Sequence, residues 1–174
     1  MAQIRSAHPD AVYVIVGAGN FEQSLRKEAQ TAGVSDRVFF AGRQGVSHEP
    51  LHGFYSLADV FVTVTWAAPG DPEGFGMVFV EAGTLGTPSI SGNIGGMSEA
   101  VLDGKTGINV PGASPPAIAA ALDRLLSDAE LRGRMGRAAR QHARLYEPDR
   151  VAAVFIRRCG LAAESSSESR LASP

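Results

Sequence analysis

Cysteine is almost absent from this sequence, and lysine is rare. Among 174 residues only Cys159 carries a thiol, which excludes an internal disulfide framework and a cysteine-based metal cluster. The only lysines are Lys27 and Lys105, and 16 basic residues face 18 acidic ones, giving a formal net charge of -2. Because nucleic-acid recognition usually requires an excess of basic residues, we expect no nucleic-acid partner. The lack of disulfide chemistry favours a cytoplasmic location.

No apolar run approaches the length of a membrane span, which needs about 20 residues. The chain has instead a globular composition, 44% hydrophobic and 20% charged, with 20 glycines and 10 prolines that supply turns. We expect one domain over residues 1–163, because the chain is too short for two domains of ordinary size. Residues 164–174 (ESSSESRLASP) are rich in serine and lack apolar periodicity, which predicts a disordered tail.

Short apolar runs alternate with helical patterns along the chain. The expected strands cover residues 11–16, 37–41, 59–64, 88–91 and 106–110. The expected helices cover residues 21–32, 48–57, 75–85, 96–102, 114–127, 128–145 and 148–161, and residues 2–9 resemble the end of another helix. The first strand is continuous and β-branched, which predicts burial on both faces. Because parallel strands need crossover helices, the alternation predicts an α/β fold: a Rossmann-like parallel sheet with helices on both faces and a helical C-terminal end.

The most informative segment is EGFGMVFVEAG, which begins at Glu73. Small residues stand where a helix begins, so a ligand could approach backbone N–H groups that have no intrahelical partner, and the helix dipole favours a phosphate there. The carboxylates of Glu73 and Glu81, about 12 Å apart along a helix, could accept hydrogen bonds from hydroxyls at both ends of a nucleotide sugar. On spacing alone, an interpretation without a ligand is equally good: Glu73 is then an acid at a helix N-terminus, and Glu81 is a solvated helix position.

Glycine-rich turns also follow other predicted strands, at Gly17-Ala18-Gly19, at Gly42-Arg43 and in SGNIGGMSE over residues 91–99. Because ligands of open α/β sheets bind beyond the carboxyl ends of the strands, these turns could border one site. Tight strand-to-helix turns need glycine without any ligand, however, and an exposed loop arginine is more often a solvated charge. The GxGxxG pattern is incomplete, since Glu22 holds its last position, and we therefore reject a nicotinamide or flavin dinucleotide site.

Metal binding has little support in the sequence. His48 and His52 are four residues apart on a predicted helix, which is a conceivable pair of ligands. No third ligand stands out beside them, so we expect no metal.

The segment EGFGMVFVEAGTLGTPSISGNIGGMSEAVLDGKTGINV closely resembles the C-terminal signature of GT-B glycosyltransferases, specifically the large retaining family 4, or glycosyl transferases group 1. The shared pattern is Glu73 and Glu81 separated by seven residues, a Gly-Gly-x-x-Glu loop at 95–99 and a Thr-Gly strand at 106–107. Upstream, VYVIVGAG, RVFFAGR and SLADVFVTV match in order, so the resemblance covers residues 10 to 150. The loop WAAPGDPEGFG is similar to that of the phosphatidylinositol mannosyltransferases of this family.

The resemblance implies that the donor is a nucleotide-diphosphate sugar, from which a mannosyl or glucosyl group is transferred with retention and without a metal or other cofactor. It implies that Glu73 is the catalytic-site residue, which holds the hydroxyls of the donor sugar, and that Glu81 accepts hydrogen bonds from the ribose. The other donor-binding positions that it implies are Gly17, Gly19, Arg43, Gly74, Phe75, Gly76, Met77 and Val78.

Family members also contain parts that residues 1–174 do not match: a first strand and helix with a phosphate-clamping arginine and lysine, and an N-terminal acceptor domain. We therefore expect a partial donor domain that binds donor weakly and has no turnover alone. The acceptor domain would be a partner in cis or in trans, so one subunit of a split transferase is an alternative, as is a non-catalytic nucleotide-binding or interaction module. A lipid acceptor would bring peripheral contact with the inner face of a membrane.

Overall fold

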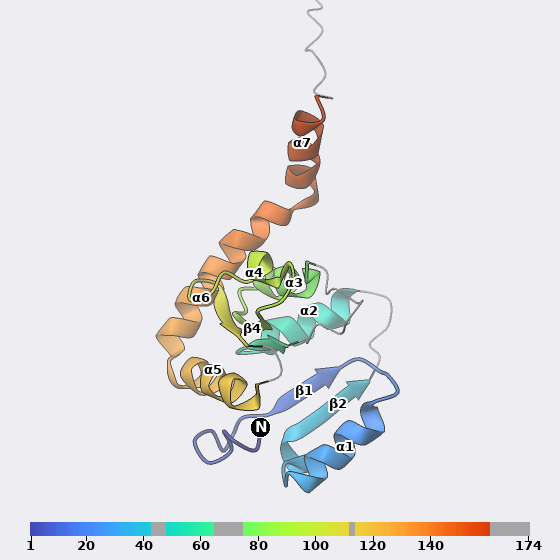
Figure 1. Ribbon diagram of the computed structural model, residues 1–174, viewed down its shortest axis with the longest axis vertical. Coiled ribbons are helices and arrows are strands. Elements are labelled where there is room, and N and C mark those ends of the chain that lie inside the picture. The colour runs from blue at the N-terminus through green and yellow to red at the C-terminus, as the bar shows by residue number, and fades with distance from the viewer. Residues whose placement is uncertain (43–47, 65–74, 112–113, 161–174) are drawn as a thin grey trace, which may run out of the picture.

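A computed structural model describes residues 1–42, 48–64, 75–111 and 114–160, with the side chains of 48–50 excepted (Figure 1). Four predicted features lie outside these residues: Arg43, Glu73, Gly74 and the tail at 164–174.

The elements follow the predicted alternation of strands and helices. The strands are β1 (Tyr13–Val16), β2 (Val38–Gly42), β3 (Phe61–Thr63), β4 (Ser89–Gly92) and β5 (Gly107–Val110). The helices are α1 (Glu22–Thr31), α2 (His48–Leu57), α3 (Met77–Thr84), α4 (Met97–Ala100), α5 (Pro115–Ser127), α6 (Ala129–Ala143) and α7 (Pro148–Arg158). Two 3₁₀ turns that the sequence analysis did not predict, η1 (Ser35–Arg37) and η2 (Arg144–Tyr146), precede β2 and follow α6.

The helix end predicted for residues 2–9 is wrong. These residues form turns, in which the N–H of Ile4 donates to the carbonyl of Met1 and the N–H of His8 donates to that of Ile4. A helical turn becomes stable only when consecutive bonds propagate it, and this segment has too few.

The strands form two parallel sheets instead of the single sheet that we expected. β1 pairs with β2, while the second sheet has the order β3-β4-β5 (Figure 1). A cleft of about 420 Å³ is lined by Tyr13 of the first sheet, by Val62 of the edge strand β3 of the second sheet and by Val64 just after that strand. No strand among the described residues fills the space between these two edges.

β1 is more exposed than the prediction of burial on both faces required. Tyr13 and Val14 are 39% and 40% exposed. Within the described part of the chain β1 has a neighbouring strand only on the β2 side, and its other edge borders the cleft, so its apolar residues are incompletely covered.

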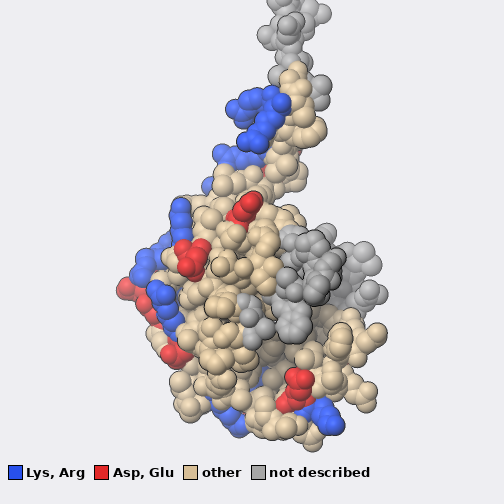
Figure 2. All heavy atoms as spheres, in the orientation of Figure 1, with Lys and Arg blue, Asp and Glu red and all other residues tan. Residues whose placement is uncertain are grey.

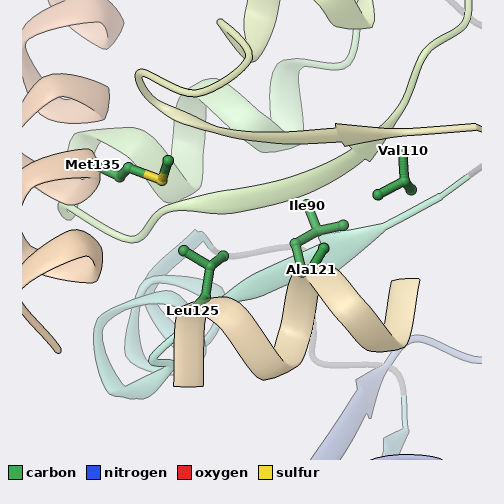
Figure 3. Close-up of a cluster of buried hydrophobic side chains, with 5 residues drawn as sticks. All are labelled: Ile90, Val110, Ala121, Leu125 and Met135. Atoms are coloured by element: carbon green, nitrogen blue, oxygen red, sulfur yellow. The ribbon is translucent and has the colours of Figure 1, made fainter. Parts of the chain in front are cut away.

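The second sheet is covered by helices on both faces, as predicted. On one face the main core cluster joins Ile90 and Val110 to Ala121 and Leu125 of α5 and to Met135 of α6 (Figure 3). Side chains alternate between the faces of a strand. Val60, Val62 and Val64 accordingly pack against this cluster, and Phe61, between Val60 and Val62, packs on the opposite face.

The opposite face of the sheet supports the start of α3. Phe61 packs against a second buried cluster that contains Phe79 of α3 and Met97 of α4. The rings of Phe61 and Phe79 meet edge to face with centroids 5.6 Å apart. This contact anchors the helix that carries Glu81.

The C-terminal end is helical, as predicted, and α7 leads away from the body of the molecule (Figure 1). None of its residues is buried, and Val151, Val154, Phe155 and Ile156 are exposed. Among residues whose structure is described, no helix combines the length and the apolar character that crossing a membrane requires.

Candidate functional site at the start of helix α3

Gly76 fixes the turn that begins α3. Its φ is +80°, a conformation that L side chains rarely adopt, and a Cβ atom added there would lie 2.7 Å from the ring of Phe79. The N–H of Phe79 donates to the carbonyl of Gly76 over 3.0 Å. The chain therefore needs a glycine here to combine this turn with the packing of Phe79.

One face of α3 is open to a ligand. Met77 and Val78 are 52% and 38% exposed, and Glu81 is half-buried. Residues three and four positions apart lie on the same face of a helix, so these three side chains form one stripe. Phe79 and Val80 point into the core. The structure therefore brings together three of the residues predicted to bind the donor.

Tyr55 of α2 reaches across to this stripe. Its hydroxyl donates to Oε2 of Glu81 over 3.1 Å, and the residue is only 8% exposed. Burial raises the pKa of Tyr55, and the neighbouring Glu81 carboxylate raises it further by its charge and by accepting the hydrogen bond. The hydroxyl is therefore a stable donor at neutral pH. Sequence analysis missed Tyr55, although a buried tyrosine usually has a partner for its hydroxyl.

Phe75 is held at the start of α3 by residues from the C-terminal part of the chain. Its ring lies against that of Tyr146, with centroids 4.8 Å apart. The hydroxyl of Tyr146 donates to the carbonyl of Glu99 over 3.3 Å, and Nε2 of His142 lies 2.8 Å from the same oxygen. Burial and the Glu99 charge raise the pKa of Tyr146. These contacts join segments more than 40 residues apart, which no local pattern could reveal.

The glycines of the first loop lie in the other sheet. Gly17 has a φ of +142° and follows β1, and its N–H donates to the carbonyl of Gly42 at the end of β2 over 3.0 Å. Gly19 is exposed in the same loop. Within the described residues no hydrogen bond joins this loop to α3. Gly17 and Gly19 are thus not linked to the α3 stripe by a hydrogen bond between described residues.

Metal-ligating side chains do not gather among the residues that the structure describes. In the described ranges, no group of three or more His, Cys, Asp and Glu side chains could hold a metal ion.

Comparison with known proteins identifies the family of this chain. A family model described as "Glycosyl transferases group 1" matches residues 1–142. The chain belongs to this family of glycosyltransferases. It is 42% identical over 143 residues to a GDP-mannose-dependent alpha-(1-6)-phosphatidylinositol monomannoside mannosyltransferase of Mycobacterium tuberculosis, an alignment that covers 81% of this chain and 37% of the relative.

A second relative is a D-inositol 3-phosphate glycosyltransferase of Streptomyces avermitilis, 38% identical over 130 residues that cover 75% of this chain and 26% of the relative. The chain thus spans about a third of the length of the curated relatives that it matches.

Solved structures confirm the α/β fold of GT-B glycosyltransferases. Anabaena HepE in complex with UDP has a TM-score of 0.73 at 23% identity and covers 88% of this chain and 41% of its own. The C-terminal domain of LpcC, a glycosyl transferase group 1 family protein from Francisella tularensis, has a TM-score of 0.72 at 24% identity. That match covers 84% of this chain and 77% of the domain.

Proposed function

We propose that this chain is the donor-binding part of a retaining glycosyltransferase, which transfers a hexosyl group from a nucleotide-diphosphate sugar to an acceptor. The observation that carries the proposal is the Glu81 carboxylate on the open face of α3, one turn from the glycine that begins the helix. A carboxylate accepts hydrogen bonds from sugar hydroxyls, and the helix N-terminus favours the diphosphate.

Each residue has a distinct role in this proposal. Glu81 accepts hydrogen bonds from the ribose, and Met77 and Val78 contact the nucleotide. The backbone at Gly74, Phe75 and Gly76 faces the diphosphate, and Glu73 holds the hydroxyls of the sugar. Gly17, Gly19 and Arg43 border the base.

The transfer breaks the bond between the anomeric carbon and the phosphate oxygen and forms a bond from that carbon to the acceptor oxygen, whose proton is released. Stabilising the leaving diphosphate lowers the barrier, because negative charge develops there. Holding the acceptor in front of the anomeric carbon supplies the second contribution. The acceptor is held by a domain outside residues 1–174, in cis or in trans.

The names of the relatives guide the choice of substrate. GDP-mannose is the donor named for the mycobacterial relative, and UDP is bound in HepE, so both nucleotides are candidates. The names of both relatives contain an inositol compound, so an inositol-containing acceptor is a candidate for this protein. The phosphatidylinositol in the name of the mycobacterial relative makes a lipid at the inner face of a membrane one form of that acceptor. We place the chain in the cytoplasm, where nucleotide sugars are substrates.

Calorimetric titration with GDP-mannose and UDP-glucose tests the proposal. We expect Glu73→Ala and Glu81→Ala each to weaken donor binding, because each removes an acceptor of sugar or ribose hydrogen bonds. Glu130→Ala, on the exposed surface of α6, is the matched control and should leave binding unchanged. Titrations that are the same for both site variants and the wild type would remove the site assignment. We also expect no turnover by the chain alone, and robust transfer would contradict that expectation.

A further inference from the structure

Among the described residues, only one of the two oxygens of the Glu81 carboxylate has a hydrogen-bond donor. Oε2 accepts the hydrogen bond from Tyr55. No described residue donates a hydrogen bond to Oε1. A carboxylate offers about four acceptor positions on its two oxygens. The tyrosine therefore uses one position and leaves enough for two hydroxyls of a ligand.

Tyr55 is itself held rigidly. Its ring meets that of Phe61 edge to face with centroids 5.3 Å apart, and Phe61 in turn packs on Phe79 of α3. The backbone of Tyr55 is also fixed, because the buried Thr87 hydroxyl donates to its carbonyl over 2.7 Å. The ring and the backbone have packing roles of their own. Among the described residues, Glu81 is the hydrogen-bond partner of the Tyr55 hydroxyl.

We infer that Tyr55 is a positioning residue for recognition of the ribose: its hydroxyl locks the Glu81 carboxylate in the orientation that accepts both ribose hydroxyls. The inference rests on the proposed function, since it assigns a partner to the residue that would bind the donor nucleotide. A side chain held in one orientation loses less conformational entropy when a ligand binds. The hydrogen bond from Tyr55 to Glu81 therefore increases affinity, although Tyr55 does not contact the ligand.

The role of the hydroxyl is separable from that of the ring. Phenylalanine keeps the contact with Phe61 and removes only the hydrogen bond to Glu81. A purely structural role would change the affinity for every nucleotide alike. A positioning role would change the affinity only for nucleotides that carry the ribose hydroxyls.

The experiment measures the affinity of the chain for GDP and UDP, and for the 2′,3′-dideoxy analogue of the nucleotide that binds, by NMR titration. For Tyr55→Phe we expect about five- to tenfold weaker binding of the ribonucleotide, the size of the net contribution of one ordinary hydrogen bond, and no change for the dideoxy analogue. Combining Tyr55→Phe with Glu81→Gln should weaken binding no further than Glu81→Gln alone, because the two residues act as a unit. Tyr13→Phe, on the exposed strand β1, is the matched control and should bind as the wild type does.

The possible failures are distinguishable. Ribonucleotide binding that is lost in Glu81→Gln and unchanged in Tyr55→Phe overturns this inference alone. Equal weakening of the ribonucleotide and the dideoxy analogue in Tyr55→Phe also overturns it, because that result indicates a structural role. A wild-type chain that binds neither GDP nor UDP overturns the proposed function and this inference with it.

Discussion

Gly76 holds the start of α3 in a conformation that depends on its missing side chain. We expect Gly76→Ala to lower the free energy of unfolding by about 1–3 kcal/mol, because the backbone is strained and the new methyl group meets the Phe79 ring. Gly104→Ala is the control: its φ is +68°, but no atom lies within 4 Å, so only the backbone cost of about 1 kcal/mol applies. Urea unfolding measures both. Equal losses would show that packing against Phe79 does not constrain the site.

Tyr55 makes stability depend on pH in the alkaline range. Burial raises its pKa in the folded chain, whereas in the unfolded chain a tyrosine ionises near pH ~10. The protonated Tyr55 hydroxyl therefore makes its full contribution to the free energy of unfolding below about pH 10, and this contribution is lost as the pH rises toward the pKa of the folded chain. For Tyr55→Phe we expect the free energy of unfolding to fall less steeply than in the wild type between about pH 9 and 11. The free energy of unfolding is measured with urea at each pH. If it falls equally steeply with pH in both proteins, the raised pKa of Tyr55 is contradicted.

Local spacing could identify only part of the site. Met77, Val78 and Glu81 share a helix face, and the 3.6-residue period alone predicts this. Tyr55 lies 26 residues before Glu81 and meets it only because α2 packs beside α3. Such a pair depends on tertiary structure, so the sequence analysis could not find it.

Arg132 of α6 joins this helix to the end of α5. Arginine side chains gather along the side of the molecule where α6 and α7 lie (Figure 2). Arg132 differs from an exposed arginine of that surface, because it donates to the carbonyls of Leu125 and Leu126 at the end of α5, each over 2.8 Å. It also forms an ion pair with Asp59 at 3.4 Å. These bonds satisfy carbonyls that a helix leaves open at its end.

We therefore expect Arg132→Ala to lower the free energy of unfolding by about 1–3 kcal/mol, the cost of leaving those carbonyls without their charged donor. Arg134→Ala is the matched control, because Arg134 is exposed and, in the part of the chain that the structure describes, its ion-pair partner is Glu130 on the same helix. Its cost should stay below about 0.5 kcal/mol. Thermal unfolding distinguishes the two, and equal costs would contradict the role of Arg132 in joining the helices.

Element boundaries were predictable where the chain carries local signals. Ser114 followed by Pro115 predicts the start of α5, and the Ser114 hydroxyl indeed accepts from the N–H of Ala117. Gly33 predicts the end of α1, and it has a φ of +66° there. The helix end expected at residues 2–9 was wrong, because helical composition without propagating bonds does not make a helix.

At the scale of the whole molecule, the edge of β1 that has no partner among the described strands is a surface for unwanted strand pairing. We expect the chain to self-associate at high concentration and Val14→Lys to reduce this, because a charge on an edge strand opposes pairing. Leu57→Lys is the control, since Leu57 is 86% exposed and belongs to α2 and not to β1. Size-exclusion chromatography measures the association. A wild-type chain that elutes as a clean monomer would contradict the prediction.

The sequence predicted the parallel α/β class but not the division into two sheets. Alternating strands and helices determine that strands run parallel, whereas strand order depends on which edges find a partner. β1 and β3 each have one partner among the described strands. The continuous β-branched pattern of β1 therefore could not by itself establish that the strand is buried on both faces.

The central claim is that the open face of α3 binds a nucleotide-sugar donor. An amide-resolved NMR titration of the wild-type chain with GDP-mannose and UDP-glucose tests it most directly. We predict that one of these donors shifts the amide signals of Gly76, Met77 and Val78, and that Glu81→Ala weakens the response. Signals at α3 that do not move with either donor, or a response that Glu81→Ala leaves unchanged, would contradict the claim.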